Sequence, residues 1–271
     1  MEIIITPQSK KHTSLIELWE FRELLFFLAW RDIKVRYKQT IIGIFWAVLQ
    51  PFLTMIVFTF FFNKVIGVSS GNIPYPLFIF SGLLLWNYFS TSLQDVSNSL
   101  IANQSIITKV YFPRIIVLIV ATIVPIVDFF FAFLFFIILF VFFHITFSFL
   151  ALLSIVPALI FSMITAVGLG SFLAILNVKY RDVRYALPFF IQLLLFVTPV
   201  IYSIRQVPSA FKLFFYLNPL TGIIDLIRVT MLHEHNMNGA GLVISGISSV
   251  IFFVIGLIFF SRYERSIADA L

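Results

Sequence analysis

The chain has 271 residues, of which 61% are hydrophobic and only 11% are charged. Its mean hydropathy is +1.07. A water-soluble globular domain cannot sustain that balance, because its surface must carry charged side chains. With no cysteine, the chain has no disulfide, no thiolate nucleophile and no cysteine metal site. These values predict an all-α integral membrane protein.

Residues 1–40 carry seven of the 18 basic residues and no short apolar core with a small-residue cleavage site, so we expect no secretory signal peptide. Ser14 and Glu17 form a capping-box pair that starts a helix. Its apolar face follows at Leu18, Phe21, Leu25 and Leu28. Basic side chains come next, at Arg31, Lys34, Arg36 and Lys38. Arg36 is spaced to pair with Asp32 at i, i+4.

A basic amphipathic helix of this kind lies in the headgroup plane and attracts anionic lipid. We therefore predict a cytoplasmic amphipathic interface segment over residues 1–40. It either anchors the topology, or receives a phosphorylated lipid substrate or braces a partner.

The remaining residues, 41–271, predict a domain of six membrane spans. Residues 41–62 form 22 residues without a charge, about 33 Å at roughly 1.5 Å per residue, which is enough to cross the hydrocarbon core. The other apolar runs are residues 75–93, 115–143, 149–176, 186–202 and 242–260.

The basic residues set the predicted orientation. If the N-terminus is cytoplasmic, 14 of the 18 Lys and Arg residues lie on the cytoplasmic side and four on the other side. This follows the positive-inside rule and predicts both ends in the cytoplasm. The basic excess is then explained by topology, so we expect no nucleic-acid partner.

Residues 203–241 predict a hairpin between spans five and six. The run 209–217 is apolar and aromatic, and Asn218 with Pro219 forms an N-cap and first-turn pair that starts a second helix. On that helix Asp225 and Arg228 are spaced to pair. We predict a periplasmic re-entrant pair of half-helices that gates a pore, with Asn218, Asp225 and Arg228 in the gate. Placed there, Arg228 should be removable without unseating the bundle.

Several chemistries are missing. No glycine is followed by lysine, so the phosphate-binding loop G-x-x-x-x-G-K-[ST] of an ATPase is absent. The run from His233 to His235 lacks the H-E-x-x-H spacing, so we expect no metal site. The loops offer no serine, histidine and acid arrangement, so we expect no catalytic residue and no cofactor in this chain.

Asp128 is the only acid deep within a predicted span. It is either a proton relay or a hydrogen-bonded helix-packing group. Transport powered from outside the chain is the favoured function. An ion-coupled carrier working through Asp128 and a membrane enzyme of lipid-linked sugars are the alternatives.

Four stretches resemble the permease subunits of ATP-binding-cassette polysaccharide exporters. They are WRDIKVRYKQT at 30–40 with Gly43, Trp46-Ala47 and Gln50-Pro51, ITKVYFPR at 107–114, YRDVRY at 180–185 with Pro188, and NPLT at 218–221. The resemblance covers nearly the whole chain in order and is greatest to the O-antigen branch. Capsule and wall teichoic acid permeases are close relatives that these motifs separate poorly.

The resemblance implies a homodimer joined to two copies of a separate ATPase, which would bind ATP and Mg²⁺. Such a complex moves a polyprenyl-pyrophosphate-linked polysaccharide from the cytoplasm to the periplasm through the bacterial inner membrane. A coupling region at 98–114, with a helix around residues 101–111, would dock on the ATPase. Its expected contact residues are Ile106, Lys109, Tyr111 and Arg114. The 203–241 hairpin would correspond to periplasmic gate helices.

Aromatic rings suit a sugar polymer that must slide, because they contact flat apolar sugar faces without fixing one hydrogen-bond pattern. The residues expected to line the channel are Trp46, Trp86, Tyr88, Phe196, Tyr202 and Tyr216. For each of them, membrane-interface anchoring or lipid contact is the alternative.

Overall fold

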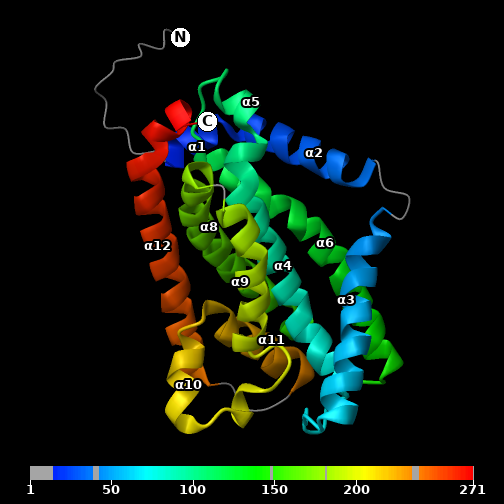
Figure 1. The fold of residues 1–271 in the computed structure, drawn as a ribbon. Coiled ribbons are helices and arrows are strands. Elements are labelled where there is room, and N and C mark those ends of the chain that lie inside the picture. The colour runs from blue at the N-terminus through cyan, green and yellow to red at the C-terminus, as the bar shows by residue number, and fades with distance from the viewer. Residues whose placement is uncertain (1–14, 39–42, 147–148, 181, 234–237, 271) are drawn as a thin grey trace.

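The computed structural model describes residues 15–38, 43–146, 149–180, 182–233 and 238–270, and the regular structure in these ranges is helical. Most long helices run along the molecule, whereas α2 lies across one end, called the α2 end below (Figure 1). The elements are α1 (Leu15–Glu20), α2 (Arg22–Lys38), α3 (Phe45–Phe58) with its π-helical continuation η1 (Thr59–Val65), α4 (Tyr75–Ala102), α5 (Gln104–Ile107), α6 (Ile115–Phe142), α7 (Phe149–Leu152), α8 (Ile155–Lys179), α9 (Val183–Val197), the 3₁₀ turn η2 (Ile204–Gln206), α10 (Ser209–Tyr216), α11 (Pro219–Leu232) and α12 (Gly239–Ala270).

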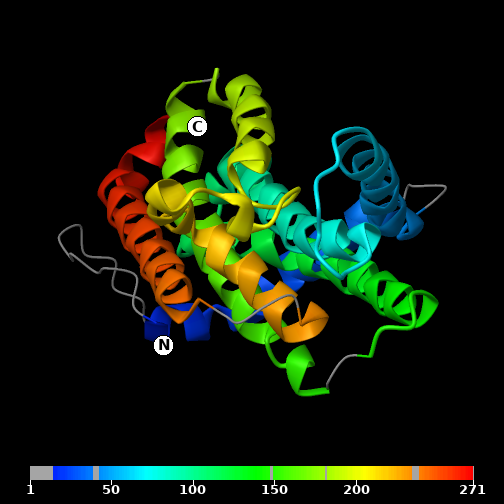
Figure 2. The same ribbon diagram turned by 90° about the horizontal axis from the view of Figure 1, so that it is seen from below.

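The start of α1 and the end of α12 both lie at the α2 end, as a topology with both ends on one side requires (Figure 1). Figure 2 views the molecule from the other end, where α10 and α11 lie across the bundle. The interface helix and the hairpin, which the sequence predicts on opposite sides of a membrane, therefore occupy opposite ends of the molecule.

Four helical segments are long and apolar enough to cross a membrane: Phe45–Val65, Ile115–Phe142, Ile155–Lys179 and Gly239–Glu264. The pair α10 and α11, bent by 104°, passes the same test together and is a fifth candidate. Helix α4, the predicted second span, has 28 residues but is less apolar. Helix α9, the predicted fifth span, has 15 residues, about 22 Å at roughly 1.5 Å per residue. The chain is thus a multi-pass membrane protein, and the count of six stays a prediction that depends on α4 and α9.

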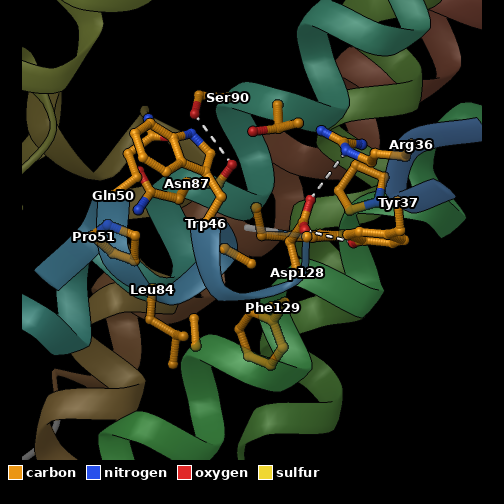
Figure 3. A pocket seen from close by; sticks show the side chains of 16 residues that line it. Arg36, Tyr37, Trp46, Gln50, Pro51, Leu84, Asn87, Ser90, Asp128 and Phe129 are labelled. Carbon is orange, nitrogen blue, oxygen red and sulfur yellow. Dashed lines mark hydrogen bonds and ion pairs between the residues drawn. The ribbon is translucent and has the colours of Figure 1, made fainter. Parts of the chain in front are cut away.

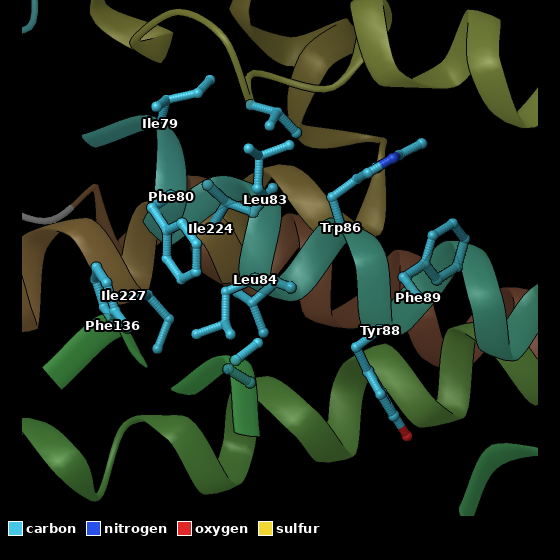
Figure 4. Close-up of a cluster of buried hydrophobic side chains, with 14 of the residues drawn as sticks. Ile79, Phe80, Leu83, Leu84, Trp86, Tyr88, Phe89, Phe136, Ile224 and Ile227 are labelled. Atoms are coloured by element: carbon cyan, nitrogen blue, oxygen red, sulfur yellow. The ribbon is translucent and has the colours of Figure 1, made fainter. Parts of the chain in front are cut away.

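Helix α4 lies at the centre of the bundle, packed between α6 and α8 and also contacting α3, α9 and α11. Phe78 and Phe80 are completely buried. The Phe80 ring stacks on Phe136 of α6 with 5.7 Å between centroids, and Figure 4 shows this layer continuing to Ile224 and Ile227 of α11. Neighbouring helices therefore cover α4, which explains why a less apolar helix fits here.

Helices α8 and α12 approach closely at two glycines. A Cβ added at Gly256 would overlap the backbone carbonyl of Gly168. Near the same contact, the Thr165 hydroxyl donates to Ser249 at 3.1 Å. Small residues let membrane helices pack backbone against backbone, and these two glycines do so here.

The hairpin begins its second helix where the sequence predicts, because the Asn218 side chain accepts from the Leu220 amide at 3.1 Å. Arg228, however, is only 2% exposed and is among the largest fully buried side chains. The expectation that Arg228 lies apart from the core is wrong, whereas the hairpin's role as a gate stays a prediction. The Arg228 side chain extends from α11 toward the segment that follows α9 and toward α4.

The buried Arg228 guanidinium donates to backbone carbonyls. It reaches Pro199 at 2.7 Å and Val200 at 2.6 Å, with further bonds to Tyr202 and to Phe78 of α4. It also lies 3.7 Å from the centroid of the Phe78 ring. These contacts satisfy carbonyls just after α9 ends, where no helix continues to supply donors.

Replacing Arg228 with Met should destabilise the protein, because Met leaves these carbonyls without donors. We expect a loss of roughly 2–5 kcal/mol in unfolding free energy, measured as a lower thermal midpoint in detergent. Arg205→Met, at an exposed arginine nearby, is the control and should change little. Equal midpoints for the two variants would show that the hydrogen bonds of Arg228 do not stabilise the fold.

Gly256→Ala should separate α8 from α12 and cost roughly 1–3 kcal/mol of stability, as overpacking does. Gly246→Ala on the same helix is the matched control, because the nearest atom to its added Cβ lies 3.7 Å away. Thermal unfolding of both purified variants tests this. A Gly256 variant as stable as the Gly246 variant would show that the contact is not tight.

Candidate functional site

Helices α2, α3, α4 and α6 line a partly open cavity of about 660 Å³ near the α2 end (Figure 3). Its polar and aromatic lining comprises Arg36 and Tyr37 of α2, Trp46 and Gln50 of α3, Asn87, Tyr88, Ser90 and Thr91 of α4, and Asp128 and Phe129 of α6. The volume lies within the roughly 300–1,000 Å³ typical of small-molecule sites. We take this cavity as the candidate site.

An ion-pair cluster closes one side of the cavity. Arg36 Nη1 lies 3.3 Å from Asp95 Oδ2, and Arg36 Nε lies 3.5 Å from Asp128 Oδ2. The predicted pairing of Arg36 with Asp32 is wrong, because Asp32 bonds to its neighbour Arg31 at 2.7 Å. Arg36 instead crosses from α2 to α4 and α6, which ties the transverse helix to two longitudinal ones.

Tyr37 completes this cluster. Its hydroxyl donates to Asp128 Oδ1 at 2.6 Å. Burial, together with the hydrogen bond to Asp128, raises the pKa of Tyr37 well above its usual value. The hydroxyl therefore stays protonated at physiological pH. Of the two roles predicted for Asp128, the geometry favours the hydrogen-bonded packing group.

The sequence could not place these partners together, since Tyr37 and Asp128 are 91 residues apart. The available signal was the pair Arg36-Tyr37 at the end of a helix and one acid in an otherwise uncharged span. Asp95 was expected only at the end of the second span. Helix packing alone turns these separate residues into one cluster.

Helix α2 packs through the predicted apolar face, whose Leu28 is buried beside partly buried Leu25. Its other side is not polar, however, because Phe26 is 70% exposed and Trp30 50%. The prediction of an amphipathic helix is thus wrong for the outer face, which carries exposed apolar side chains. Ser14, the predicted cap, lies outside the described residues.

The predicted headgroup residues of α2 have different surroundings. Arg31 donates to Asn103 at the end of α4, at 2.6 Å. Lys34 lies over the Trp30 ring at 5.1 Å. Lys38 is exposed, and Arg36 is committed to the ion-pair cluster. Only the lysines therefore present their charge outward, and lipid contact stays a prediction for them.

The six aromatic residues predicted for a channel do not form one surface in this chain. Trp46 and Tyr88 line the cavity. Trp86 and Tyr216 are buried, and Phe196 is exposed on α9. Tyr202 donates its hydroxyl to the backbone carbonyl of Phe196 at 2.9 Å. These six residues therefore do not line a common channel within a single chain.

The predicted coupling region differs in form from the expectation. Helix α4 continues to Ala102, and only the four-residue helix α5 follows, so the predicted helix over 101–111 is wrong. Asn103 interrupts it by donating its side-chain amide to the Ser99 carbonyl at 3.0 Å. Lys109 is exposed and Tyr111 is 77% exposed, at the α2 end.

Two other predicted contact residues are less available. Ile106 is partly buried, and Arg114 donates through its side chain to the backbone carbonyl of Glu264 on α12. In the run from His233 to His235, where no metal site is expected, His233 ends α11 in a left-handed conformation and residues 234–235 lie outside the described residues. Elsewhere, the described part of the chain holds no group of three His, Cys, Asp or Glu side chains suited to a metal.

Arg36→Leu should destabilise the protein, because it leaves Asp95 and Asp128 facing each other without a cation. Asp128→Asn should recover part of that loss, with a coupling energy of about 1 kcal/mol or less after solvent screening. Thermal unfolding of the two single variants and the double variant measures the coupling. Arg22→Leu, at an exposed arginine of the same helix, is the control. Strictly additive losses would contradict the cluster.

Comparison with known proteins agrees with this architecture. A family model described as ABC-2 type transporter matches residues 23–232. The chain is 29% identical over 253 residues to the O-antigen export system permease protein RfbA of Myxococcus xanthus, covering 92% of this chain and 96% of that protein. An O-antigen export system permease protein RfbA of Klebsiella pneumoniae is 28% identical over 259 residues, with 92% and 95% covered.

A more distant relative is the polysialic acid transport protein KpsM of Escherichia coli, 18% identical over 236 residues, with 87% of this chain and 92% of that protein covered. The family match runs from α2 through the cavity walls to the end of α11. An all-helical membrane chain matched over most of its length in this way belongs to the ABC-2 type transporter family.

Proposed function

We propose that the chain is the membrane-spanning subunit of an ABC exporter that moves polyprenyl-pyrophosphate-linked O-antigen polysaccharide across the bacterial inner membrane. Two copies of the chain join two copies of a separate ATPase subunit, which binds ATP and Mg²⁺. The α2 end faces the cytoplasm. The α10–α11 hairpin faces the periplasm and forms the gate, with Arg228 holding its base.

The observation that carries this proposal is similarity over almost the full length of both chains to permeases named for O-antigen export. The sequence contains no phosphate-binding loop, which is consistent with a separate ATPase subunit as the energy source. The exposed Lys109 and Tyr111, close to α5, offer that subunit a cationic and an aromatic contact. Tyrosine is enriched where binding energy concentrates at protein interfaces.

Capsular polysaccharide or teichoic acid is the second candidate cargo. The similarity to a polysialic acid transport protein favours the capsule, but at lower identity than the O-antigen permeases. An ion-coupled carrier is less favoured, because Asp128 is already engaged by Arg36 and Tyr37. A carrier of that kind needs a carboxylate that releases and rebinds its proton during each cycle.

Cells that lack the chain should lose surface polysaccharide and accumulate the lipid-linked glycan inside. A plasmid copy should restore export only when the partner ATPase is also present and cellular ATP is maintained. Surface glycan and internal lipid-linked glycan are measured together. Export that continues after ATP depletion, with a proton gradient intact, would support the ion-coupled carrier instead.

Lys109→Glu combined with Tyr111→Ala should reduce the ATPase recovered with the tagged permease several-fold, without changing the amount of folded permease. The matched control is Lys64→Glu with Phe61→Ala, which alters an exposed cation and an exposed ring in η1. Co-purification from detergent-solubilised membranes provides the measurement. Equal recovery from both double variants would place the ATPase contact elsewhere.

A further inference from the structure

We infer that the cavity between α2, α3, α4 and α6 binds an uncharged sugar unit of the transported glycan, rather than its diphosphate or its lipid tail. This inference rests on the proposed function and assigns one part of the substrate to one site. It follows from the cavity's charge, its free amide groups and its exposed indole.

The charge of the cavity is unsuited to a diphosphate. Arg36 is the one cation among the described lining residues, and it lies between Asp95 and Asp128. Asp128 lines the cavity and Asp95 does not, but both carboxylates already pair with this guanidinium. A diphosphate placed there would meet like charge at short range and no uncommitted cation. The cavity therefore excludes the anionic part of the substrate.

The opposite part of the cavity offers neutral hydrogen-bonding groups. Figure 3 shows Trp46, Gln50 and Asn87 gathered away from Arg36, Tyr37 and Asp128. The side-chain amides of Gln50 and Asn87 make no hydrogen bond to another residue within the described part of the chain. Each amide can donate and accept, as sugar hydroxyls do. A sugar ring can therefore bond to both amides in either sense.

Trp46 supplies the apolar contact that a sugar face requires. Its side chain lines the cavity and is 54% exposed, so its ring is available to a ligand. An indole gives a large flat contact without imposing a hydrogen-bond pattern. The Thr91 hydroxyl lies on the same lining as Asn87 and adds one more neutral group.

A lipid tail is the less suitable occupant. It would leave the side-chain amides of Gln50 and Asn87 facing hydrocarbon without partners, and burying polar groups unsatisfied is unfavourable. The cavity also has apolar lining, at Ala47, Pro51, Leu84, Pro125, Phe129 and Ala132. Beside the polar groups, these residues keep water away from a bound sugar. They do not make the cavity selective for a lipid tail.

Two substitutions at Asn87 separate the three occupants, in cells whose only copy of the chain is the tagged variant. Asn87→Leu removes the hydrogen bonds and should lower surface polysaccharide roughly tenfold, as expected for losing one or two of them. Asn87→Asp keeps an acceptor but adds negative charge, and should export within about threefold of wild type, because hydroxyls donate readily to a carboxylate. Surface glycan is normalised to the amount of folded permease.

Gln94→Leu and Gln94→Glu are the matched controls, because Gln94 is an exposed amide on the same helix that does not line the cavity. Both should export normally. If Asn87→Leu lowers the amount of folded protein, Gln50→Leu and Gln50→Glu repeat the comparison at an exposed position of α3.

Normal export by the leucine variants would assign the cavity to a lipid tail and overturn the inference. Loss of export in the acidic variants, equal to or greater than in the leucine variants, would assign it to the diphosphate and also overturn it. If the wild-type chain itself fails to restore export, the proposed function fails. Reduced export in the leucine variants together with near-normal export in the acidic variants supports an uncharged sugar.

Discussion

The enclosure of α4 by other helices is the constraint on which the rest of the structure depends. This helix carries Asn87, Ser90 and Thr91 in its central turns, and lipid would leave such groups unsatisfied. Packing by α6 and α8 covers its apolar sides, while α3 leaves a cavity over its polar side. The position of the candidate site and its polar lining therefore have the same cause. The polar part of a central helix must face protein or a polar space.

The two ends of the bundle are held by the same physical means, an arginine that bridges helices. At the hairpin end, Arg228 donates to carbonyls where α9 has ended, and also reaches α4. At the α2 end, Arg36 links the transverse helix to carboxylates of α4 and α6. The first arginine is completely enclosed, whereas the second borders a cavity. The first can only stabilise the fold, but the second can also contact a ligand.

Much of the fold could be predicted from hydropathy and capping signals. The all-helical class, the helix start at Asn218 and the packing face of α2 follow local sequence patterns. The site could not be predicted in this way. Arg36 and Asp128 come together through packing over a long sequence separation, and no local pattern contains that information. The burial of Arg228 was missed for a related reason, since its partners are backbone carbonyls, which leave no trace in residue identity.

Helix α3 forms one wall of the cavity and makes few buried contacts with the rest of the bundle. Only 11% of the apolar window in Phe45–Val65 is buried, against 50% in Ile155–Lys179, and its neighbours in the bundle are mainly α4 and α6. Few buried contacts mean that little free energy opposes displacement. Within one chain, a displacement of α3 would widen the volume beside Trp46 and Gln50 and would leave the contacts among α4, α6 and α8 intact. The cavity thus lies between well-packed helices and one helix with few buried contacts, α3. A polymer in the cavity would displace α3 more easily than the other helices.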